Sequence, residues 1–391
     1  MSRINIGLFG FGVVGEGIYQ VLTQKPQLEA DIKKIVIKDI QKKREAPADL
    51  FSTEASAILA DKNIDLVVEL IDDPIAALDI VTRAIKNGKS VVSANKQMIA
   101  RNHVELIQLS KEHGVSFLYE AAACGSVPIV RNLEEYFNKD LLSSVEGIVN
   151  GSTNYILSNM LSKKLPYEEV LSTAQTKGFA ESDPSVDVCG LDASYKLSIL
   201  ILHAFGKRVA PQDITVKGIT SLRVSDFEYA LARGKVIKLL AKSSVNEQGE
   251  VIFASVLPTF IDQESALGKT NNEYNGVLVE GSLDDNQFFY GKGAGRYPTS
   301  SAVFSDISAF KSGYQYGYRK GIEQQVIQQE VESKFYVSFD NKTAFDTRIF
   351  EQIDEHFVNK THTYITGTIK SQTLKSSGVL AQDDISIVAI D

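Results

Sequence analysis

Cysteine is scarce in this sequence: among 391 residues there are two, Cys124 and Cys189. They lie far apart and lack the spacing of metal ligands, which argues against a disulfide framework and fits a reducing cytoplasm. Long apolar runs are missing as well. The longest, around residues 197–205, is interrupted by Ser198 and His203 and is too short to span a bilayer. The first apolar run is broken by glycines and ends at Glu16, so we expect no signal peptide.

Positive charge is also in short supply. The chain carries 41 Lys and Arg against 49 Asp and Glu, a net charge of −8, and its pI is near 5.4. This balance argues against nucleic acid or an anionic membrane as a partner. A hydrophobic content of 43% is ordinary for a globular protein. The length suggests two or three domains, and we expect a soluble, cytoplasmic enzyme.

The N-terminal residues combine a strand, a glycine-rich turn and a helix. Residues 3–9 read as a short buried strand, residues 10–15 (GFGVVG) follow at once, and residues 16–24 continue with helical periodicity. Gly10 permits a tight turn, Gly12 lets the backbone approach a pyrophosphate, and Gly15 lets helix and strand pack closely. The helix N-terminus would face the phosphates with unpaired N–H groups. This order of elements predicts dinucleotide binding.

Strand-like and helix-like segments alternate over the first 125 residues. The predicted strands are 34–38, 65–71, 90–93 and 115–119, and helical patterns cover 76–87 and 104–112. Strands that alternate with helices of this length indicate a parallel sheet covered on both faces. After about residue 145, a helical stretch through 196–205 precedes alternating segments such as 251–257 and 277–280. This change indicates a second domain with a mixed sheet.

The residues after the second strand bear on the choice of cofactor. Asp39 lies where an acidic residue would bind a ribose 2′-hydroxyl and favour NAD. Lys38 and the basic residues 42–44 crowd the same place and would pair with a 2′-phosphate, favouring NADP. They are equally compatible with a solvated basic loop. The sequence leaves NAD and NADP open.

The segment 178–196 (GFAESDPSVDVCGLDASYK) concentrates charged side chains between glycine and proline residues. If its end is helical, Asp192 and Lys196 share one face at i and i+4. A carboxylate beside a lysine can hold and tune a proton-transfer group. The alternative is an ordinary helical ion pair.

Several long motifs in order resemble the homoserine dehydrogenase family, over most of residues 1 to about 325. They are GFGVVG at 10–15, SANK at 93–96, YEAAACGSVP at 119–128, GIVNGSTNYIL at 147–157, the acidic segment at 178–196 and GKGAGRYPTSSAVFSDI at 291–307. The resemblance implies NAD(P)-dependent interconversion of L-homoserine and L-aspartate 4-semialdehyde, on the route to threonine and methionine.

The resemblance also assigns roles to residues that match the family motifs. It implies Lys196 as the leading acid/base group, with Lys96 as its partner or alternate and Asp192 as the carboxylate that orients a lysine. A lysine can accept a proton when burial or a second cation lowers its pKa. For substrate binding the matching residues are Glu181, our choice for the ammonium group, and Asp187, Gly151 and Ser152. No histidine falls in a motif that would make it the catalytic base.

Two further sites follow from the resemblance. The cofactor set comprises Gly10, Phe11, Gly12, Val13, Val14, Gly15, Lys38, Asp39, Ser93 and Lys96. Glu120, with the carbonyls of Ala123, Gly125 and Val127, matches a monovalent cation site for Na⁺ or K⁺. The family further implies a homodimer or higher homo-oligomer.

The chain departs from the family pattern at several positions. Asp72 and Asp73 stand where a Gly-Gly pair is usual after the third strand, Phe179 where tyrosine is common, and Cys124 and Ser126 replace glycines. Two aspartates near the cofactor phosphates would be electrostatically unfavourable. The alternative function is therefore a catalytically impaired NAD(P)-binding sensor or scaffold. Another oxidoreductase, acting on sugars or semialdehydes, is a smaller possibility.

The expected architecture is an α/β protein in three parts. Residues 1–130 form a Rossmann-type dinucleotide-binding domain with a parallel sheet, completed by about 298–325. Residues 131–297 form an α+β catalytic and dimerisation domain with a mixed sheet. Residues 330–391 form a small α+β module, regulatory-like or oligomeric, with strands at 334–339, 363–369 and 385–390 and a helix at 345–357.

Overall fold

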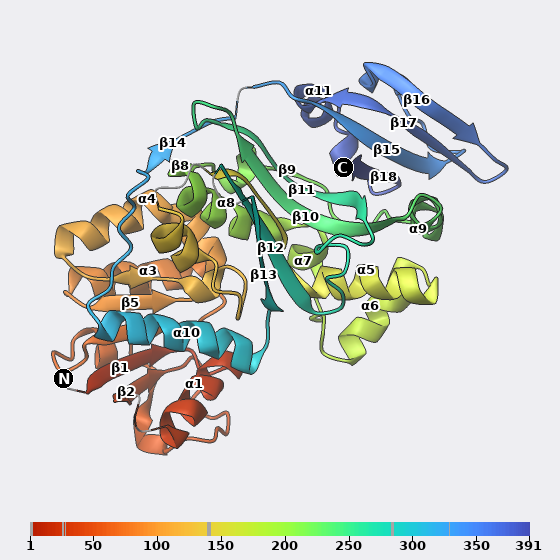
Figure 1. Ribbon diagram of the computed structural model, residues 1–391. Coiled ribbons are helices and arrows are strands. Elements are labelled where there is room, and N and C mark those ends of the chain that lie inside the picture. Colours follow the sequence, from red (N-terminus) through yellow and green to blue (C-terminus); the bar gives the residue numbers. More distant parts are fainter. Residues whose placement is uncertain (1–2, 26, 28, 139–141, 283–284, 328) are drawn as a thin grey trace. The chain divides into compact units, whose positions relative to one another are not determined.

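The computed structural model divides into two compact units, which we describe separately (Figure 1). It describes residues 3–25, 27, 29–138, 142–282, 285–327 and 329–391. Unit 1 comprises residues 1–138 and 292–322, and unit 2 comprises residues 139–291 and 323–391. The three-part division of the chain stays a prediction. No helix among the described residues is both long and apolar enough to cross a membrane.

Unit 1 is built on a six-stranded sheet with the order β3-β2-β1-β4-β5-β6, and each recorded strand pair is parallel. Its strands are β1 (Ile4–Phe9), β2 (Ala30–Val36), β3 (Phe51–Ser52), β4 (Leu66–Glu69), β5 (Ser90–Ser93) and β6 (Phe117–Leu118). The strand order reverses between β1 and β4, which is the topological switch point of a doubly wound fold. The predicted N-terminal parallel sheet is confirmed.

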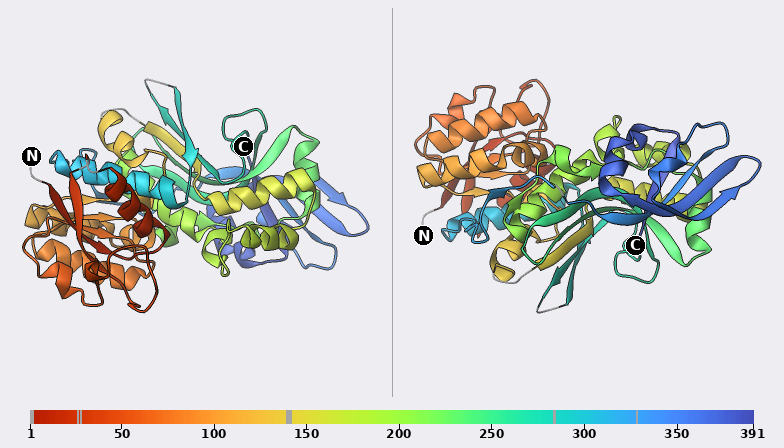
Figure 2. Two further views of the ribbon diagram at one scale, coloured as in Figure 1. Left: turned by 90° about the horizontal axis from the view of Figure 1, so that it is seen from below. Right: turned by 90° about the horizontal axis from the view of Figure 1, so that it is seen from above.

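Helices cover both faces of this sheet (Figure 2). The helices of unit 1 are α1 (Val13–Gln24), α2 (Ser56–Leu59), α3 (Pro74–Lys86), α4 (Lys96–His113) and α10 (Arg296–Lys311). α1 packs against α10, while α3 packs against α4. At the crossing of α1 and α10, a Cβ on Gly17 would lie 2.6 Å from the Ser300 hydroxyl oxygen. The close packing of α10 therefore ties residues 292–322 to the N-terminal sheet.

Unit 2 contains a mixed sheet, as predicted. The sheet has ten strands, with the path β13-β12-β7-β10-β11-β18-β15-β17-β16 and β9 paired to β11. Its strands are β7 (Leu142–Ile148), β9 (Thr215–Val216), β10 (Lys235–Val245), β11 (Val251–Asp262), β12 (Tyr274–Gly281), β13 (Asn286–Lys292), β15 (Glu332–Asp340), β16 (Gln352–Val358), β17 (His362–Lys370) and β18 (Ile385–Ile390). A separate two-stranded sheet pairs β8 (Lys207–Arg208) with β14 (Glu323–Gln324).

The helices of unit 2 are α5 (Gly151–Lys163), α6 (Tyr167–Thr176), α7 (Ser185–Val188), α8 (Leu191–Phe205), α9 (Val224–Leu231) and α11 (Ser371–Ser376). α8 begins after Gly190 and ends before Gly206, and both glycines have left-handed backbone angles. Such residues stop a helix from continuing, so they fix the length of α8. α5 and α8 both pack on β10, which places them on the same sheet.

The predicted helix at 345–357 is wrong. A single 3₁₀ turn spans Thr347–Ile349, and residues 352–358 form β16, which pairs antiparallel with β17. The predicted strands at 334–339, 363–369 and 385–390 are all present, as β15, β17 and β18. β18 lies between β15 and β11 and pairs with β11 in parallel. The C-terminal strands therefore extend the sheet that contains β7 and β10.

Candidate functional site

The glycine-rich turn has the geometry expected of a phosphate-binding loop. Gly10 has φ +89°, and a Cβ there would lie 2.7 Å from the Leu70 carbonyl oxygen. A Cβ on Gly15 would lie 2.5 Å from the Gly10 carbonyl oxygen. At Gly12 a Cβ would meet no described atom within 4 Å. Gly10 and Gly15 are thus required by close packing, while Gly12 leaves space in front of the N-terminus of α1.

Two of the basic residues after β2, Lys38 and Arg44, contact other groups of unit 1. Arg44 donates to the backbone carbonyls of Asp39 and Lys42, each at 2.7 Å. The Asp39 carboxylate accepts from the Gln41 N–H at 2.9 Å. The Lys38 ammonium lies 3.9 Å from the Asp73 carboxylate, in an exposed ion pair. Through its two hydrogen bonds to backbone carbonyls, Arg44 holds the loop that follows Lys38 and Asp39.

One residue of the Asp72-Asp73 pair, Asp73, has a structural explanation. Asp73 is the N-cap of α3, and its carboxylate accepts from the N–H groups of Ile75 and Ala76 at 3.0 and 3.1 Å. These hydrogen bonds and the nearby Lys38 hold the pKa of Asp73 below its usual value. The negative charge is thus offset locally by backbone N–H groups. The departure from Gly-Gly adds a helix cap at this turn.

The SANK segment is anchored by a residue that the sequence analysis missed. Glu69, at the end of β4, is fully buried and contacts the Ser93 hydroxyl at 2.6 Å. Asn95 caps α4 by accepting from the Met98 N–H at 2.9 Å, and its side chain donates to the Ile71 carbonyl at 3.0 Å. Lys96 is the first residue of α4. No local sequence signal marks this contact, because residues 69 and 93 become neighbours only through the register of β4 and β5.

The loop with the candidate cation ligands lies in unit 1. The Glu120 carboxylate accepts from the N–H groups of Val130 and Arg131, each at 2.9 Å, and lies 3.6 Å from the Arg131 guanidinium. Its side chain is therefore committed to protein groups. Gly125 has φ +58°, and a Cβ there would lie 2.3 Å from the Gly293 carbonyl oxygen. In the described part of the chain, His, Cys, Asp and Glu side chains form no group of three suited to a metal ion.

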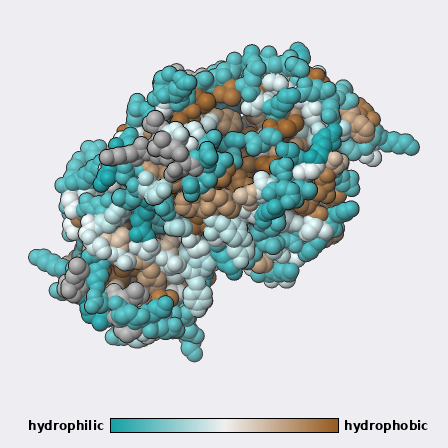
Figure 3. All heavy atoms as spheres, in the orientation of Figure 1, coloured by the Kyte–Doolittle hydropathy of each residue, from teal (hydrophilic) through white to brown (hydrophobic). Residues whose placement is uncertain are grey.

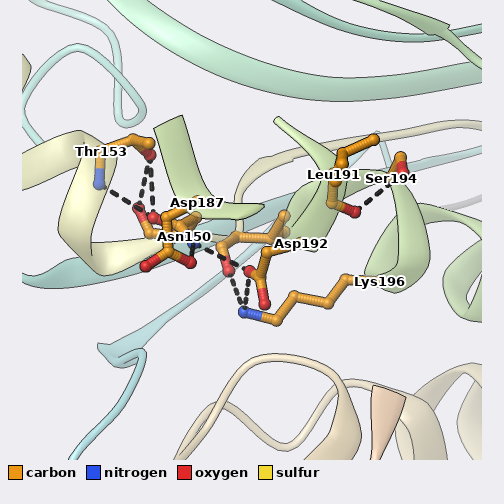
Figure 4. Close-up of polar contacts among 8 residues, drawn as sticks. Asn150, Thr153, Asp187, Leu191, Asp192, Ser194 and Lys196 are labelled. Atoms are coloured by element: carbon orange, nitrogen blue, oxygen red, sulfur yellow. Dashed lines mark hydrogen bonds and ion pairs between the residues drawn. The ribbon is translucent and has the colours of Figure 1, made fainter. Parts of the chain in front are cut away.

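The acidic segment of unit 2 forms a buried polar cluster around Lys196 (Figure 4). As predicted, Asp192 and Lys196 share one face of a helix, with the Lys196 ammonium 2.7 Å from the Asp192 carboxylate. The same ammonium donates to the Val149 carbonyl at 2.7 Å. The side chains are 10% and 2% exposed, so neither belongs to a solvated charge run. Two hydrogen-bond donors of Lys196 are therefore occupied by fixed acceptors.

Asn150, which the sequence analysis did not single out, connects two carboxylates of this cluster. Its amide donates to Asp187 at 2.7 Å and to Asp192 at 2.9 Å (Figure 4). Its oxygen accepts from the Thr153 N–H at 2.9 Å and so caps α5. An asparagine directly before a helix is a recognisable N-cap signal. Its contacts with residues from the acidic segment depend on the tertiary fold.

The remaining predicted substrate residues lie around the same elements. Gly151 and Ser152 form the start of α5, and a Cβ on Gly151 would lie 2.8 Å from the Glu273 carbonyl oxygen. Glu181 is exposed, and its backbone carbonyl accepts from Gln175 at 3.0 Å. Phe179 stacks on Tyr155, with ring centroids 4.2 Å apart. Asp187 is thus linked to the Lys196–Asp192 pair, because Asn150 donates to both carboxylates. Glu181 contacts Gln175 through its backbone carbonyl and not through its carboxylate.

Comparisons with known proteins agree for both units. The family described as "Homoserine dehydrogenase, NAD binding domain" matches residues 10–120, and the family "Homoserine dehydrogenase" matches residues 128–308. These ranges contain most of the residues discussed above, including the glycine-rich turn, the SANK segment and the Lys196 cluster.

Individual relatives and solved structures point the same way. A homoserine dehydrogenase of Synechocystis sp. is 41% identical over 313 residues, which cover 78% of this chain and 72% of that protein. One from Bacillus subtilis is 38% identical over 318 residues, covering 79% and 73%. The crystal structure of a homoserine dehydrogenase from Thiobacillus denitrificans superposes with a TM-score of 0.87 at 28% identity, covering 100% of this chain and 99% of that one.

Proposed function

The chain belongs to the homoserine dehydrogenase family, and on that premise we propose that it interconverts L-homoserine and L-aspartate 4-semialdehyde with NAD⁺ or NADP⁺. The observation that carries this proposal is the buried Lys196–Asp192 pair at 2.7 Å, held by Asn150 in a chain that also has a dinucleotide-binding turn. A binding-only protein has no need of such a pair. The reaction serves threonine and methionine biosynthesis.

Lys196 is the proposed acid/base group. Hydride leaves the carbon that bears the hydroxyl while a proton leaves the oxygen, so a basic group must lie within hydrogen-bond reach of that oxygen. An ammonium has three N–H donors. Two of them go to Val149 and Asp192, and the third is left for the substrate oxygen. In the oxidation, neutral Lys196 accepts the hydroxyl proton in this third direction. The bound nicotinamide would supply the hydride acceptor.

Asp192 acts through Lys196 and is a positioning residue. It holds the amine in place, and it stabilises the ammonium that forms when the proton arrives. For the substrate, we assign Glu181 to the ammonium group of homoserine, with Asp187, Gly151 and Ser152 around the amino-acid end. Lys96 is the proposed partner or alternate of Lys196, since a second cation favours the neutral form of a nearby amine.

Unit 1 is proposed to hold the dinucleotide. The turn at 10–15 would receive the pyrophosphate at the N-terminus of α1. Ser93, at the end of β5, and Lys96, at the start of α4, would also contact the dinucleotide. Asp39 favours NAD through the ribose 2′-hydroxyl, and Lys38 favours NADP through a 2′-phosphate. The two residues are adjacent, so direct comparison of both cofactors decides between them.

A monovalent cation, Na⁺ or K⁺, is proposed at the loop of residues 120–127. The Glu120 side chain is occupied by Val130 and Arg131, so the ligands would be backbone carbonyls of Glu120, Ala123, Gly125 and Val127. An uncharged set of oxygens suits a monovalent ion, because hard cations prefer oxygen and a divalent ion usually needs carboxylates. In this place the ion would order the loop and take no part in proton transfer.

We propose that the protein is a cytoplasmic homodimer or larger homo-oligomer. Apolar side chains gather over the strands of unit 2 on the face seen in Figure 3. On β13, Phe288 and Tyr290 are 37% and 53% exposed. Exposed apolar patches of this kind mark protein interfaces. Light scattering of the purified protein tests the oligomeric state. Both cysteines are free thiols, in keeping with a cytoplasmic location.

The activity is tested by absorbance at the reduced-nicotinamide band, with purified protein, L-homoserine, and NAD⁺ or NADP⁺. We expect reduction of at least one cofactor with homoserine and none with sugars. Lys196→Ala should abolish turnover while the variant still binds the cofactor. Tight cofactor binding without turnover in the wild type would contradict the proposed reaction and favour a sensor. Turnover on sugars and not on homoserine would contradict the proposed substrate.

A further inference from the structure

Three strand ends meet at the switch point of the sheet in unit 1. Phe9 of β1 is paired with Glu69 of β4, which is paired with Ser93 of β5. Ligands of doubly wound sheets bind outside the carboxyl ends of the strands at this point. Glu69 is fully buried there, between an apolar residue and a serine. A buried carboxyl group needs hydrogen-bond partners, and the identity of these partners indicates its structural role.

The hydrogen bonds of Glu69 have a defined direction. One carboxylate oxygen accepts from the Ile71 N–H at 2.7 Å, and the other lies 2.6 Å from the Ser93 hydroxyl. Ser93 in turn accepts from the Asn95 N–H at 3.1 Å. A backbone N–H can only donate, so one lone pair of the Ser93 oxygen is taken by Asn95. The single Ser93 proton is left to go to Glu69 or to a ligand.

The protonation state of Glu69 decides between these two directions. An ionised carboxylate only accepts hydrogen bonds, so it takes the Ser93 proton. Burial raises the pKa of Glu69 to about 7, the hydrogen bonds from Ser93 and Ile71 oppose that rise, and the negative charge of Asp72 adds to it. Glu69 is therefore mainly ionised above neutral pH, and below it the carboxylic acid can donate to Ser93 instead.

We infer that Glu69 is a positioning residue that orients the Ser93 hydroxyl so that a lone pair, and not a proton, faces the cofactor. This rests on the proposed function, in which Ser93 contacts the dinucleotide. The complementary group on the cofactor is then a group that only donates, such as the carboxamide N–H₂. A phosphate oxygen is an acceptor and would not fit. A protonated Glu69 reverses the Ser93 hydroxyl and removes the match.

The test measures cofactor affinity as a function of pH, by the fluorescence of the reduced nicotinamide. NADH is the first probe because it lacks a 2′-phosphate. The 2′-phosphate of NADPH is a phosphate monoester, which titrates near about pH 6, so it would add a pH dependence of its own. Between pH 8.5 and pH 6, we expect the Kd of the wild type to rise about tenfold, the value of one hydrogen bond made or lost. If NADH does not bind, NADPH is used with Ser93→Ala as the reference.

Two variants test whether Glu69 changes cofactor affinity by orienting the Ser93 hydroxyl or by the charge of its carboxylate alone. In Glu69→Gln, the amide oxygen can accept from Ile71 and the amide N–H₂ can donate to Ser93, which copies the protonated state at every pH. Its Kd should be high and independent of pH, equal to the wild type at pH 6. Ser93→Ala should also lose the pH dependence. Circular dichroism checks that each variant is folded.

The outcomes are distinguishable. A flat profile in the wild type, a Glu69→Gln variant that binds as tightly as the wild type at pH 8.5, or a Ser93→Ala variant with the same pH dependence as the wild type each overturns the inference. Failure of the wild type to bind either cofactor at any pH overturns the proposed function itself. The wild-type profile needs no substitution, so it stands even if a variant does not fold.

Discussion

At the scale of single residues, Lys196 and Asp192 form a buried pair, and removing either partner has two separable effects. We expect Lys196→Met to lower kcat by about 10²–10⁴, the usual contribution of general acid–base catalysis. It also leaves Asp192 buried without its ammonium, which should cost about 3 kcal/mol of unfolding free energy. Steady-state kinetics and urea unfolding measure the two effects.

The double variant Lys196→Met with Asp192→Asn is the control for this pair. Neutral side chains avoid the unpaired buried charge, so stability should recover while activity stays low. Cofactor affinity should be the same in all three proteins, because the dinucleotide residues lie in unit 1. A single variant with wild-type kcat would contradict the assigned role of Lys196.

We expect Lys238 to make the stability of unit 2 depend on pH. It is buried on β10 among neutral acceptors, Asn154, Thr270 and Asn271. Burial lowers its pKa from 10.5 to about 8. Between these values the unfolded chain holds the proton and the folded protein does not, so unfolding free energy rises with pH over about pH 8–10.5, by up to about 3 kcal/mol.

We expect Lys238→Met to flatten this part of the stability profile, as measured by denaturant unfolding from pH 7 to 10.5. Lys235→Met is the matched control, because Lys235 lies on the same strand and is only partly buried. A Lys238→Met profile as steep as that of the wild type would show that another group titrates in this range.

At the scale of elements, the turn before α3 combines a helix cap with an ion pair. Two substitutions of Asp73 separate these roles. Asp73→Ala removes both, and the lost cap should cost about 1 kcal/mol of unfolding free energy. Asp73→Asn keeps an equally good cap and removes the negative charge 3.9 Å from the Lys38 ammonium.

We expect Asp73→Asn to keep wild-type stability and to raise affinity for NADP⁺ relative to NAD⁺ by up to a few fold, since an exposed ion pair is worth about 0–1 kcal/mol. Titration of both cofactors against both variants measures this ratio. An unchanged ratio in both variants would exclude Lys38 from recognition of a 2′-phosphate.

Local patterns predicted most elements but not their partners. The glycine turn, the alternation of strands and helices, and the i, i+4 pair of Asp192 and Lys196 each depend on nearby residues, so they could be read directly. Glu69 and Asn150 act on residues far along the chain, which become neighbours only through strand register and helix packing. Their roles were therefore invisible to pattern analysis.

The wrong helix at 345–357 has a related cause. Phe345, Ile349, Ile353 and Phe357 recur at helical spacing. Pairing with β17 overrides this pattern. The seven residues of β16 are all exposed, so the strand lacks the alternation that would have identified it. The match with structures of the same family shows the overall architecture that the motifs implied.

At the scale of the whole molecule, residues 330–391 are integral to unit 2. Buried Asp226, on α9, accepts hydrogen bonds from Tyr336 at 3.0 Å and from Ser338 at 2.6 Å. Lys217 donates to the carbonyl of Gln382 at 2.6 Å. Leu257 of β11 belongs to the same apolar cluster as Phe335 and Ile387.

We therefore expect removal of residues 330–391 to destabilise all of unit 2 and to abolish activity. In the full chain, amide hydrogens of β10, β11, β15 and β17 should exchange in one cooperative step. Hydrogen exchange measured by mass spectrometry tests this, with the unit 1 strands as the internal control. A truncated protein with an unchanged melting temperature would mean that the C-terminal strands are an independent module.

The place of β18 also sets an order of events during synthesis. It fills the position between β11 and β15, and it follows both of them in the chain. Until β18 has been made, the part of β11 that pairs with it, at Thr259 and Phe260, presents an open edge of unpaired N–H and carbonyl groups, a known route to aggregation. The earlier strands β7, β10 and β11 must therefore wait for β18 before their sheet is complete, and the nascent chain is a natural client for chaperones that shield strand edges.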